Sequence, residues 1–401
     1  MKTSSAAVDA TRESHLNAVQ LPHHFELIDT GRGFCALTIL VFHFRHFLMP
    51  EAGAPLPETD LGALPFHAIL RPLYQYGLYA VHAFWLISGF VFSHVYGDGK
   101  VRQGHIYALN RFSRLYPLHF VTLVTVAILQ AISYYQLGYF QIYANNDTCR
   151  FILHIFFASN WWLQEVDSFN APIWSVSVEV LVYVIFFFSA RHAIGRTGMA
   201  TAALATTGFA LFWVTKLIVF YCMGCFYVGA VIYVLNRRAV MISPGVNLAT
   251  SLVLAILLSA VPLLVGELSS AKMSLLRISI FTCWLWVAAA TELRFGATCV
   301  KRLRWIGDIT YSSYLVHVPV QILILVVLDS AVGDRTIVSS PWFFLAYILG
   351  VMLLSRATFL WFERPAQNMI RQGASSYLQQ RRHAQTFSVM SSSAEQKMSS
   401  S

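Results

Sequence analysis

The sequence predicts an all-α, polytopic integral membrane helical bundle of about ten transmembrane helices, with both termini in the cytoplasm. Of its 401 residues, 57% are hydrophobic and only 12% are charged, and the mean hydropathy is +0.58. A soluble globular protein carries about 25% charged residues, roughly twice this share. The composition excludes a disordered chain, a disulfide-stapled scaffold and an ordinary soluble enzyme.

The spans follow from the lengths of the apolar stretches, because about 17–25 such residues cross a bilayer as a helix. Ten stretches qualify: 31–48, 78–96, 115–136, 172–190, 197–215, 217–235, 246–265, 273–291, 309–328 and 341–362. Lys216 alone separates the fifth from the sixth, so one long broken helix is the alternative there. The short stretch 149–163 predicts a re-entrant or interfacial segment rather than a span.

The distribution of basic residues predicts the orientation. The two sides of the ten spans carry twenty and five Lys and Arg residues, and both termini lie on the side with twenty. Under the positive-inside rule that side is cytoplasmic. The bias accounts for the net charge of +9 without a nucleic-acid partner. We expect a multi-pass protein of a plasma membrane or a bacterial inner membrane.

Three regions follow from these patterns. Residues 1–24 form a cytoplasmic N-terminal segment, 25–366 the membrane domain, and 367–401 a cytoplasmic tail. The first 27 residues lack the apolar core of a cleavable signal peptide. The tail is rich in Ser, Gln and Ala, which predicts that it is largely disordered. The six cysteines are scattered, and the Cys222-x-x-Cys225 pair lies in an apolar span, so we expect neither disulfides nor a metal site.

The first span carries Arg32 and His43, which are eleven residues apart. About three helical turns separate them, so both lie on one face, about 16 Å apart along the axis. A guanidinium suits an anionic group, and an imidazole suits proton transfer near neutral pH. The structural alternative is an interfacial anchor for Arg32 and a hydrogen-bonded packing role for His43.

The third span begins beside Arg111 and Arg114, which share a helical face at i, i+3. Such a pair binds phosphate groups through paired hydrogen bonds. The alternative is that both arginines only anchor the helix at the cytoplasmic interface.

Two further spans carry polar stripes. In the fourth, Ser175, Glu179 and Tyr183 recur at i, i+4 and i+8, which places a carboxylate inside the membrane. Glu179 then needs a partner on a facing helix, either a catalytic imidazole or the arginine of a structural ion pair. In the ninth, the stripe consists of Thr310, Ser313, Tyr314, His317 and Gln321. Hydrogen bonding between helices is the alternative to a catalytic role for this second stripe.

Together these residues predict a polar path from a basic cytoplasmic mouth to a buried histidine. That layout suits a donor with an anionic head and a long arm, such as a coenzyme A thioester. It also suits a transporter of a small anion, and the residues alone leave both open.

Six segments in the same order resemble the membrane acyltransferase family 3, over residues 25–366. They are Ile28-Asp29-Thr30-Gly31-Arg32-Gly33 with His43, Phe84-Trp85-Leu86-Ile87-Ser88-Gly89-Phe90, Arg111-Phe112-Ser113-Arg114-Leu115-Tyr116-Pro117, Trp174-Ser175-Val176-Ser177-Val178-Glu179, Thr310-Tyr311-Ser312-Ser313-Tyr314-Leu315-Val316-His317 and Phe362-Glu363-Arg364-Pro365. The sequence departs from the family at Gly31, where Leu is common, and at Asn110, where a basic residue is frequent. Neither departure removes a reactive group.

The resemblance implies an integral membrane O-acyltransferase that takes an acyl group, in the simplest case acetyl, from cytoplasmic acyl-CoA. The acceptor is then a hydroxyl of an extracytoplasmic molecule such as a glycan, bound by the spans and by the loops 49–77 and 137–171. Acyl-CoA is a co-substrate, and we expect no permanently bound cofactor. The family's Arg-x10-His motif falls on Arg32 and His43, its Arg-x-x-Arg motif on Arg111 and Arg114, and its Trp-Ser-x-Ser-x-Glu motif supplies Glu179.

These positions define an expected mechanism. His43 acts as general base on the acceptor hydroxyl, and a covalent acyl-histidine is the less economical route. Glu179 orients the imidazole. The CoA phosphates are held by Arg111 and Arg114 with help from Arg32. The acceptor path or the oxyanion is served by Ser175, Tyr314 and His317.

Two other functions were weighed against this one. A secondary transporter or exporter of a small anion or glycan predicts flux without acyl-CoA and often shows inverted repeats. No internal repeat is visible in the sequence. A non-catalytic scaffold leaves the buried histidine, the carboxylate and the arginine pair without a purpose.

Overall fold

The computed structural model of the protein describes residues 22, 24–97, 104–161, 167–192, 197–265, 270–374 and 376. Within these ranges the regular structure is helical, and no strand occurs in them. The expected N-terminal segment 1–24 and disordered tail 367–401 lie almost entirely outside the described residues. The last long helix nevertheless continues past residue 366 and reaches Ala374.

The described ranges contain ten helical stretches long and apolar enough to cross a membrane, which confirms the predicted number. The stretches comprise α2 (Glu26–His43) with η1 (Phe44–Leu48), α3 (His67–Tyr76) with α4 (Ala80–Tyr96), α5 (Gly104–Leu137), α7 (Trp174–Arg191), α8 (Gly198–Thr215), α9 (Ile218–Ile242), α10 (Pro244–Val265), α11 (Ser270–Phe295), α13 (Thr310–Val327) and α14 (Pro341–Thr358). Several begin earlier than the apolar stretches, because polar interfacial residues continue the helix.

The stretch 197–235 forms two helices rather than one. Lys216 ends α8 in the left-handed conformation, with φ of 60°. Its backbone N–H donates to the carbonyl of Phe212, which closes the last turn of the helix. The next helix packs closely against α8, because a Cβ added at Gly208 would lie 2.6 Å from the backbone nitrogen of Gly224. This hairpin settles the alternative in favour of ten spans.

The described part of the short apolar stretch 149–163, which ends at residue 161, contains no helix long enough to span a membrane. It contains α6 (Thr148–Ile155), a helix of eight residues capped by the Asp147 side chain, which accepts from the backbone N–H of Arg150. Eight residues rise only about 12 Å, which is less than half the thickness of a bilayer core. The expectation of a non-spanning segment is confirmed.

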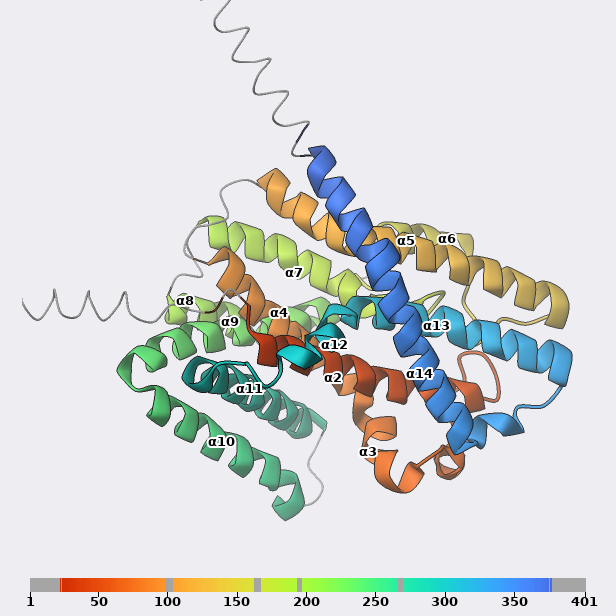
Figure 1. The fold of residues 1–401 in the computed structure, drawn as a ribbon, viewed down its shortest axis with the longest axis horizontal. Helices are drawn as coiled ribbons and strands as arrows, with labels where there is room; N and C mark the ends of the chain where they lie inside the picture. Colours follow the sequence, from red (N-terminus) through yellow and green to blue (C-terminus); the bar gives the residue numbers. More distant parts are fainter. Residues whose placement is uncertain are drawn as a thin grey trace, which may run out of the picture.

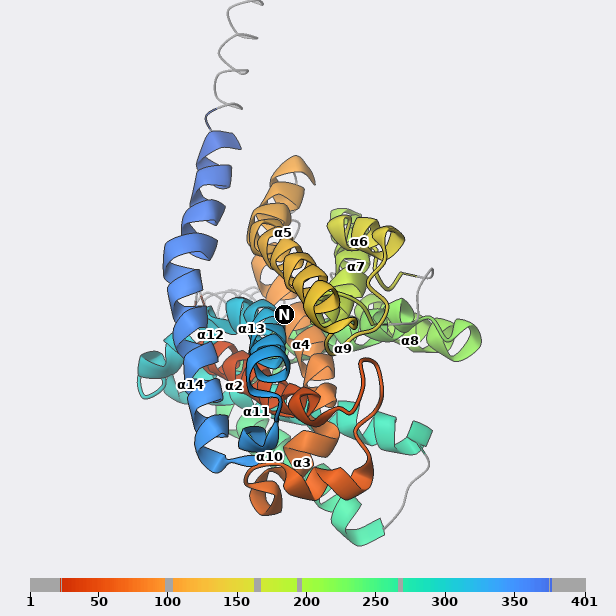
Figure 2. The same ribbon diagram turned by 90° about the vertical axis from the view of Figure 1, so that its right-hand side faces the viewer.

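Helices α2 and α13 lie in the middle of the bundle, and α14 runs along its outside (Figure 1, Figure 2). The tightest crossing joins α4 to α9. A Cβ added at Gly89 would lie 1.7 Å from the carbonyl oxygen of Phe226, and one at Gly229 would lie 1.8 Å from that of Leu86. Small residues that let two membrane helices approach at backbone distance are the usual means of such packing.

The start of α2 is held by a carboxylate from α11. Glu292 accepts the backbone N–H of Glu26 at 2.8 Å and that of Leu27 at 2.9 Å, through its two oxygens. These donors are among the first four N–H groups of a helix, which have no partner within it, and the negative charge faces the positive end of the helix dipole. This contact fixes the helix that carries Arg32 and His43.

Candidate active site

Two cavities lie along α2. The first, called here the arginine cavity, has a volume of about 370 Å³ and is lined by Arg32, Arg111, Arg114, Glu179 and Arg304 among others. The second, called the histidine cavity, has a volume of about 510 Å³ and is lined by His43, Arg45, His46, Asp167 and Trp174 among others. The two ends of one helix thus line two different spaces.

His43 meets His317 inside the bundle. The Nδ1 atom of His43 lies 3.0 Å from Nε2 of His317, and the two rings are inclined by only 16°. The Nδ1 atom of His317 lies 3.0 Å from the carbonyl oxygen of Ser313. A carbonyl only accepts, so this Nδ1 carries a proton, and Nε2 of a neutral His317 accepts from Nδ1–H of His43. The remaining Nε2 of His43 then carries a lone pair, as a general base requires.

A third imidazole completes this cluster. The rings of His43 and His46 have centroids 4.9 Å apart, because the 3₁₀ turn η1 brings residue 46 back beside residue 43. Gln321 holds both: its Oε1 lies 3.1 Å from Nδ1 of His46, and its Nε2 donates to the His43 carbonyl at 2.8 Å. His46 was not predicted from the sequence as a site residue, although its spacing of three from His43 is visible there.

Glu179 lies elsewhere. Within the described part of the chain, no hydrogen bond or ion pair joins it to His43. The hydroxyls of Ser88 and Tyr183 hydrogen-bond to its buried carboxyl, and the charges of Arg32 and Arg111 act on it across the arginine cavity. His317 takes the orienting position that was expected of Glu179. The sequence showed that a buried carboxylate needs a partner but not which cavity it faces.

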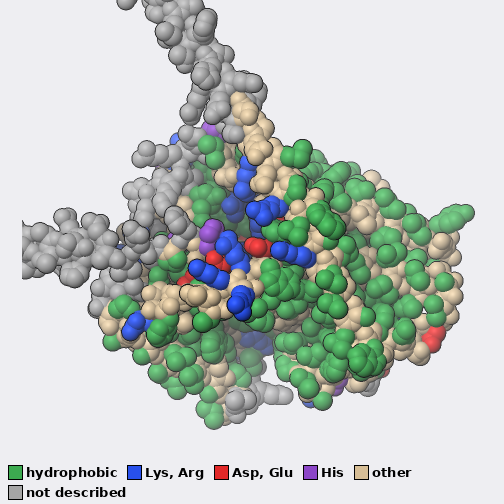
Figure 3. Space-filling model, in the orientation of Figure 1, with side chains coloured by type: hydrophobic (Ala, Val, Ile, Leu, Met, Phe, Trp, Pro, Cys, Tyr) green, Lys and Arg blue, Asp and Glu red, His purple; other side chains and the backbone are tan. Residues whose placement is uncertain are grey.

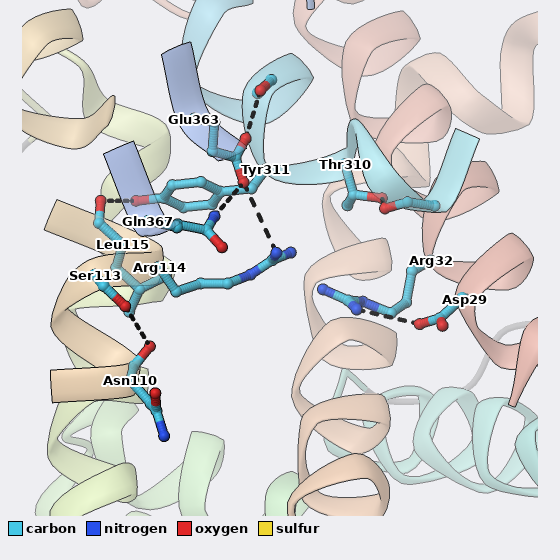
Figure 4. Close-up of polar contacts among 12 residues, drawn as sticks. Asp29, Arg32, Asn110, Ser113, Arg114, Leu115, Thr310, Tyr311, Glu363 and Gln367 are labelled. Carbon is cyan, nitrogen blue, oxygen red and sulfur yellow. Dashed lines mark hydrogen bonds and ion pairs between the residues drawn. The ribbon is translucent and has the colours of Figure 1, made fainter. Parts of the chain in front are cut away.

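The three predicted arginines do meet in one cavity, but their pairing differs. Arg32 pairs with Asp29 at 3.3 Å, within its own helix. Arg114 lies 3.8 Å from Glu363, whose other oxygen accepts the Ser312 hydroxyl at 2.5 Å. The guanidinium groups of Arg32 and Arg114 point toward each other from α2 and α5 (Figure 4). Glu363 therefore neutralises one of the arginines that line this cavity.

Arg111 differs from both, since no carboxylate of the described residues pairs with it. It donates to the Tyr96 hydroxyl at 3.0 Å, and its Cζ lies 4.7 Å from the centroid of the Phe92 ring. Arg304, to which no role was assigned from the sequence, also lines this cavity and pairs with Glu26 at 3.1 Å. Lys and Arg side chains gather on this face of a surface that is otherwise largely apolar (Figure 3).

Ser175 and Tyr314 stand between the two cavities. Their hydroxyls are 2.6 Å apart, and the Tyr314 hydroxyl donates to the Pro172 carbonyl at 2.7 Å. Ser175 and Tyr314 line the arginine cavity, whereas Pro172 lines the histidine cavity. The two sets of lining residues do not overlap among the described residues, so the cavities are separate, and Ser175 and Tyr314 form part of the wall between them.

The loop that carries Asp167 to the histidine cavity is hydrogen-bonded to α13, at a point where a proline interrupts the hydrogen bonds of that helix. Pro319 has no N–H, so the carbonyl of Leu315 lacks its helical donor. The Asn170 side chain supplies one, with Nδ2 at 3.0 Å from that oxygen. On the other side of the loop, Ser168 bonds to His154 at 3.1 Å. These contacts hold Asp167 at the cavity.

Comparison with known families identifies the chain. The acyltransferase domain of family 3 matches residues 25–359, which include both cavities' principal residues but end before Glu363. Comparison with curated proteins and with solved structures gives no match. The match covers most of the chain, and the ten apolar helices agree with it. The protein therefore belongs to acyltransferase family 3 and is a multi-pass membrane acyltransferase.

Proposed function

We propose that the protein is an O-acyltransferase of a plasma or bacterial inner membrane. It moves an acyl group, in the simplest case acetyl, from cytoplasmic acyl-CoA to a hydroxyl of an extracytoplasmic acceptor of the carbohydrate class. The observation that carries the proposal is the pair of cavities, one lined by arginines and one by histidines, that meet at Ser175 and Tyr314.

The arginine cavity suits the donor. Coenzyme A carries its phosphates at one end and the thioester at the end of a long arm. Arg111 forms no ion pair with a described carboxylate, so it binds phosphate at the least cost. Arg32 and Arg114 keep their carboxylates and contribute their remaining N–H groups. The thioester then points inward, toward the wall formed by Ser175 and Tyr314.

The histidine cavity suits the acceptor. The loops expected to bind it contribute Gly53, Tyr143, Asn145, Asn160 and Asp167 to the lining. Amide and carboxyl groups hydrogen-bond to sugar hydroxyls, and an aromatic ring such as that of Trp174 packs against the apolar face of a sugar. The acceptor hydroxyl reaches Nε2 of His43 inside this cavity.

The reaction requires the Tyr314 side chain to move out of the wall, so that the thioester carbonyl comes within reach of the acceptor hydroxyl. The acceptor oxygen attacks the thioester carbonyl carbon while Nε2 of His43 takes its proton. His317 accepts from Nδ1–H of His43 and holds the ring in the basic tautomer. Collapse of the tetrahedral intermediate breaks the C–S bond, and the imidazolium returns the proton to the departing thiolate. The enzyme ends in its starting state.

The test uses purified protein in vesicles with radiolabelled acetyl-CoA outside and candidate glycosides inside. Parent protein should transfer label to a glycoside, and His43→Ala should lose about 10²- to 10⁴-fold in rate. The matched control is His82→Ala, a half-buried histidine that lines neither cavity. Equal transfer by His43→Ala and the parent would exclude the proposed base, and glycoside flux without acetyl-CoA would instead support a transporter.

A further inference from the structure

Arginines line three cavities of the described structure, and most of them are neutralised. Four form ion pairs with a carboxylate: Arg32 with Asp29, Arg114 with Glu363, Arg304 with Glu26 and Arg335 with Asp329. Arg111 and Arg45 line a cavity without such a pair among the described residues. Each of the two cavities of the proposed reaction thus holds one guanidinium that forms no ion pair with a described carboxylate.

Arg45 lies two residues beyond His43, in the 3₁₀ turn η1 at the end of the first span. Its Cζ lies 4.2 Å from the centroid of the Phe42 ring, which fixes the guanidinium against an aromatic face. Stacking in this manner leaves the N–H edge for a ligand. That edge matches the two oxygens of a carboxylate or a phosphate.

Among the described residues, no carboxylate forms an ion pair with Arg45. The imidazoles of His43 and His46 line the same cavity. Tyr143, which faces Arg45, is a phenol whose pKa is raised well above its usual range by burial. Arg45 lies at the end of a membrane span, where a cation is unfavourable unless an anion joins it. A ligand that enters the cavity supplies that anion.

Asp167 lines the same cavity but does not neutralise Arg45. No ion pair joins these two described residues, and Tyr143 interacts with the charge of each. The cavity therefore presents a guanidinium beside the histidines and a carboxyl at a separate place. Together with Asn145 and Asn160, Asp167 suits hydroxyls, whereas Arg45 suits a charged substituent.

We propose that Arg45 recognises an anionic group of the acceptor, a carboxylate or a phosphate on a sugar, next to the hydroxyl that His43 deprotonates. The proposal rests on the proposed function and adds the class of acceptor to it. Acidic sugars, such as uronates and sugar phosphates, are then the preferred substrates over neutral sugars of the same ring.

The experiment compares methyl glucuronide, glucose 1-phosphate and methyl glucoside. The uronide and the glucoside share a ring and differ by a carboxylate in place of a hydroxymethyl group. Acetyl transfer is measured with parent protein, Arg45→Gln and Arg45→Lys in vesicles. We expect the parent to prefer at least one anionic acceptor in kcat/KM by about tenfold to a hundredfold, the range for a hydrogen bond to a charged group. Comparing the uronide with the sugar phosphate shows whether Arg45 recognises a carboxylate or a phosphate.

Arg45→Gln should abolish this preference, lowering kcat/KM for the preferred anionic acceptor about tenfold to a hundredfold more than that for methyl glucoside. Arg45→Lys should retain part of the preference, because it keeps the charge but loses the planar fork. Equal rates with acidic and neutral acceptors in the parent would overturn the proposal. Equal loss with both in Arg45→Gln would also overturn it, since Arg45 would then act on the reaction and not on the acceptor charge.

A binding measurement tests the anion site of Arg45 independently of acyl transfer. The same glycosides are added to detergent-solubilised protein without acetyl-CoA, and the shift in melting temperature is measured. Stabilisation by an anionic glycoside that disappears in Arg45→Gln supports the site even where no acetyl group moves. Absence of such stabilisation in the parent contradicts the site while leaving acyl transfer to be judged by its own assay.

Discussion

Nε2 of His317 lies 3.0 Å from Nδ1 of His43, and this contact joins α13 to the last turn of α2. Because Nδ1 of His317 faces the Ser313 carbonyl, the pair forms a directed chain of hydrogen bonds. The direction leaves the outermost nitrogen, Nε2 of His43, as the acceptor. A neighbouring helix therefore sets the protonation of the proposed base.

The first prediction concerns His317 as a positioning residue. His317→Phe removes the acceptor for Nδ1–H of His43, so the imidazole loses both its fixed tautomer and its support when charged. We expect kcat to fall about 10²- to 10³-fold while KM for acyl-CoA changes less than about twofold. Steady-state kinetics in vesicles measure both. His317→Gln, which keeps an acceptor, should recover part of kcat; a rise in KM with unchanged kcat would contradict the role.

The second prediction separates Arg111 from Arg114. Arg111→Gln should weaken acyl-CoA binding about tenfold or more with little change in melting temperature, because no described carboxylate depends on it. Arg114→Gln instead leaves Glu363, whose side chain is 2% exposed, without its cation. Arg114 is 28% exposed, so we expect a loss of about 2–3 kcal/mol, below the cost of breaking a fully buried pair.

The double variant Arg114→Gln/Glu363→Gln is the control for that pair. Removing both charges should restore most of the melting temperature, since the unpaired buried carboxylate is gone. Thermal unfolding in detergent and acyl-CoA titration give the two readings. A double variant that is less stable than Arg114→Gln would show that the two side chains act independently.

The third prediction concerns the wall between the cavities. Tyr314→Phe loses the hydrogen bonds to Ser175 and to the Pro172 carbonyl. Two bonds of about 1 kcal/mol each hold the closed position, so the open population should rise about tenfold or more. We expect faster hydrolysis of acetyl-CoA without acceptor. Tyr227→Phe, which loses a hydroxyl contact to Ser189 remote from both cavities, is the control and should leave hydrolysis unchanged.

The fourth prediction concerns the crossing of α4 and α9. Gly89→Ala places a Cβ 1.7 Å from a backbone oxygen, which no side-chain rotation relieves, so the helices must separate. We expect a loss of about 3 kcal/mol or more in stability, at the upper end for an overpacked core. Gly31→Ala is the matched control, because its Cβ meets nothing within 4 Å. Its free energy of unfolding should rise by about 0.5–1 kcal/mol, because Ala has less backbone freedom than Gly in the unfolded chain.

The fifth prediction is a dependence of stability on pH. Burial lowers the pKa of His154 from 6.5 to about 3, and its ring bonds to Ser168 in the loop over the histidine cavity. The folded state keeps this ring neutral, so stability is complete above pH 6.5 and falls below it, as the unfolded state takes up the proton. The slope should reach about 1.4 kcal/mol per pH unit between pH 6 and 4. The melting temperature of His154→Gln should depend less on pH over that range than the melting temperature of the parent.

Much of the fold was predictable because a bilayer imposes a simple rule. A helix must satisfy its own backbone and present about twenty apolar residues, so hydropathy alone located the ten spans. The same rule flagged Arg32, His43, Arg111, Arg114, Glu179 and His317 as costly residues that need a reason. Five of them line the two cavities, and His317 contacts His43.

Which of these residues touch was decided by the tertiary structure. Periodicity gives the face of a helix but not its neighbour or the height at which two faces meet, and Glu179 was accordingly matched to the wrong site. His317 reaches His43 because α13 packs directly on α2, and Glu363 reaches Arg114 from the far end of the chain. The sequence determined that charges are buried and where the chain crosses the membrane. The partners of those charges depend on packing between distant segments, which no local pattern records.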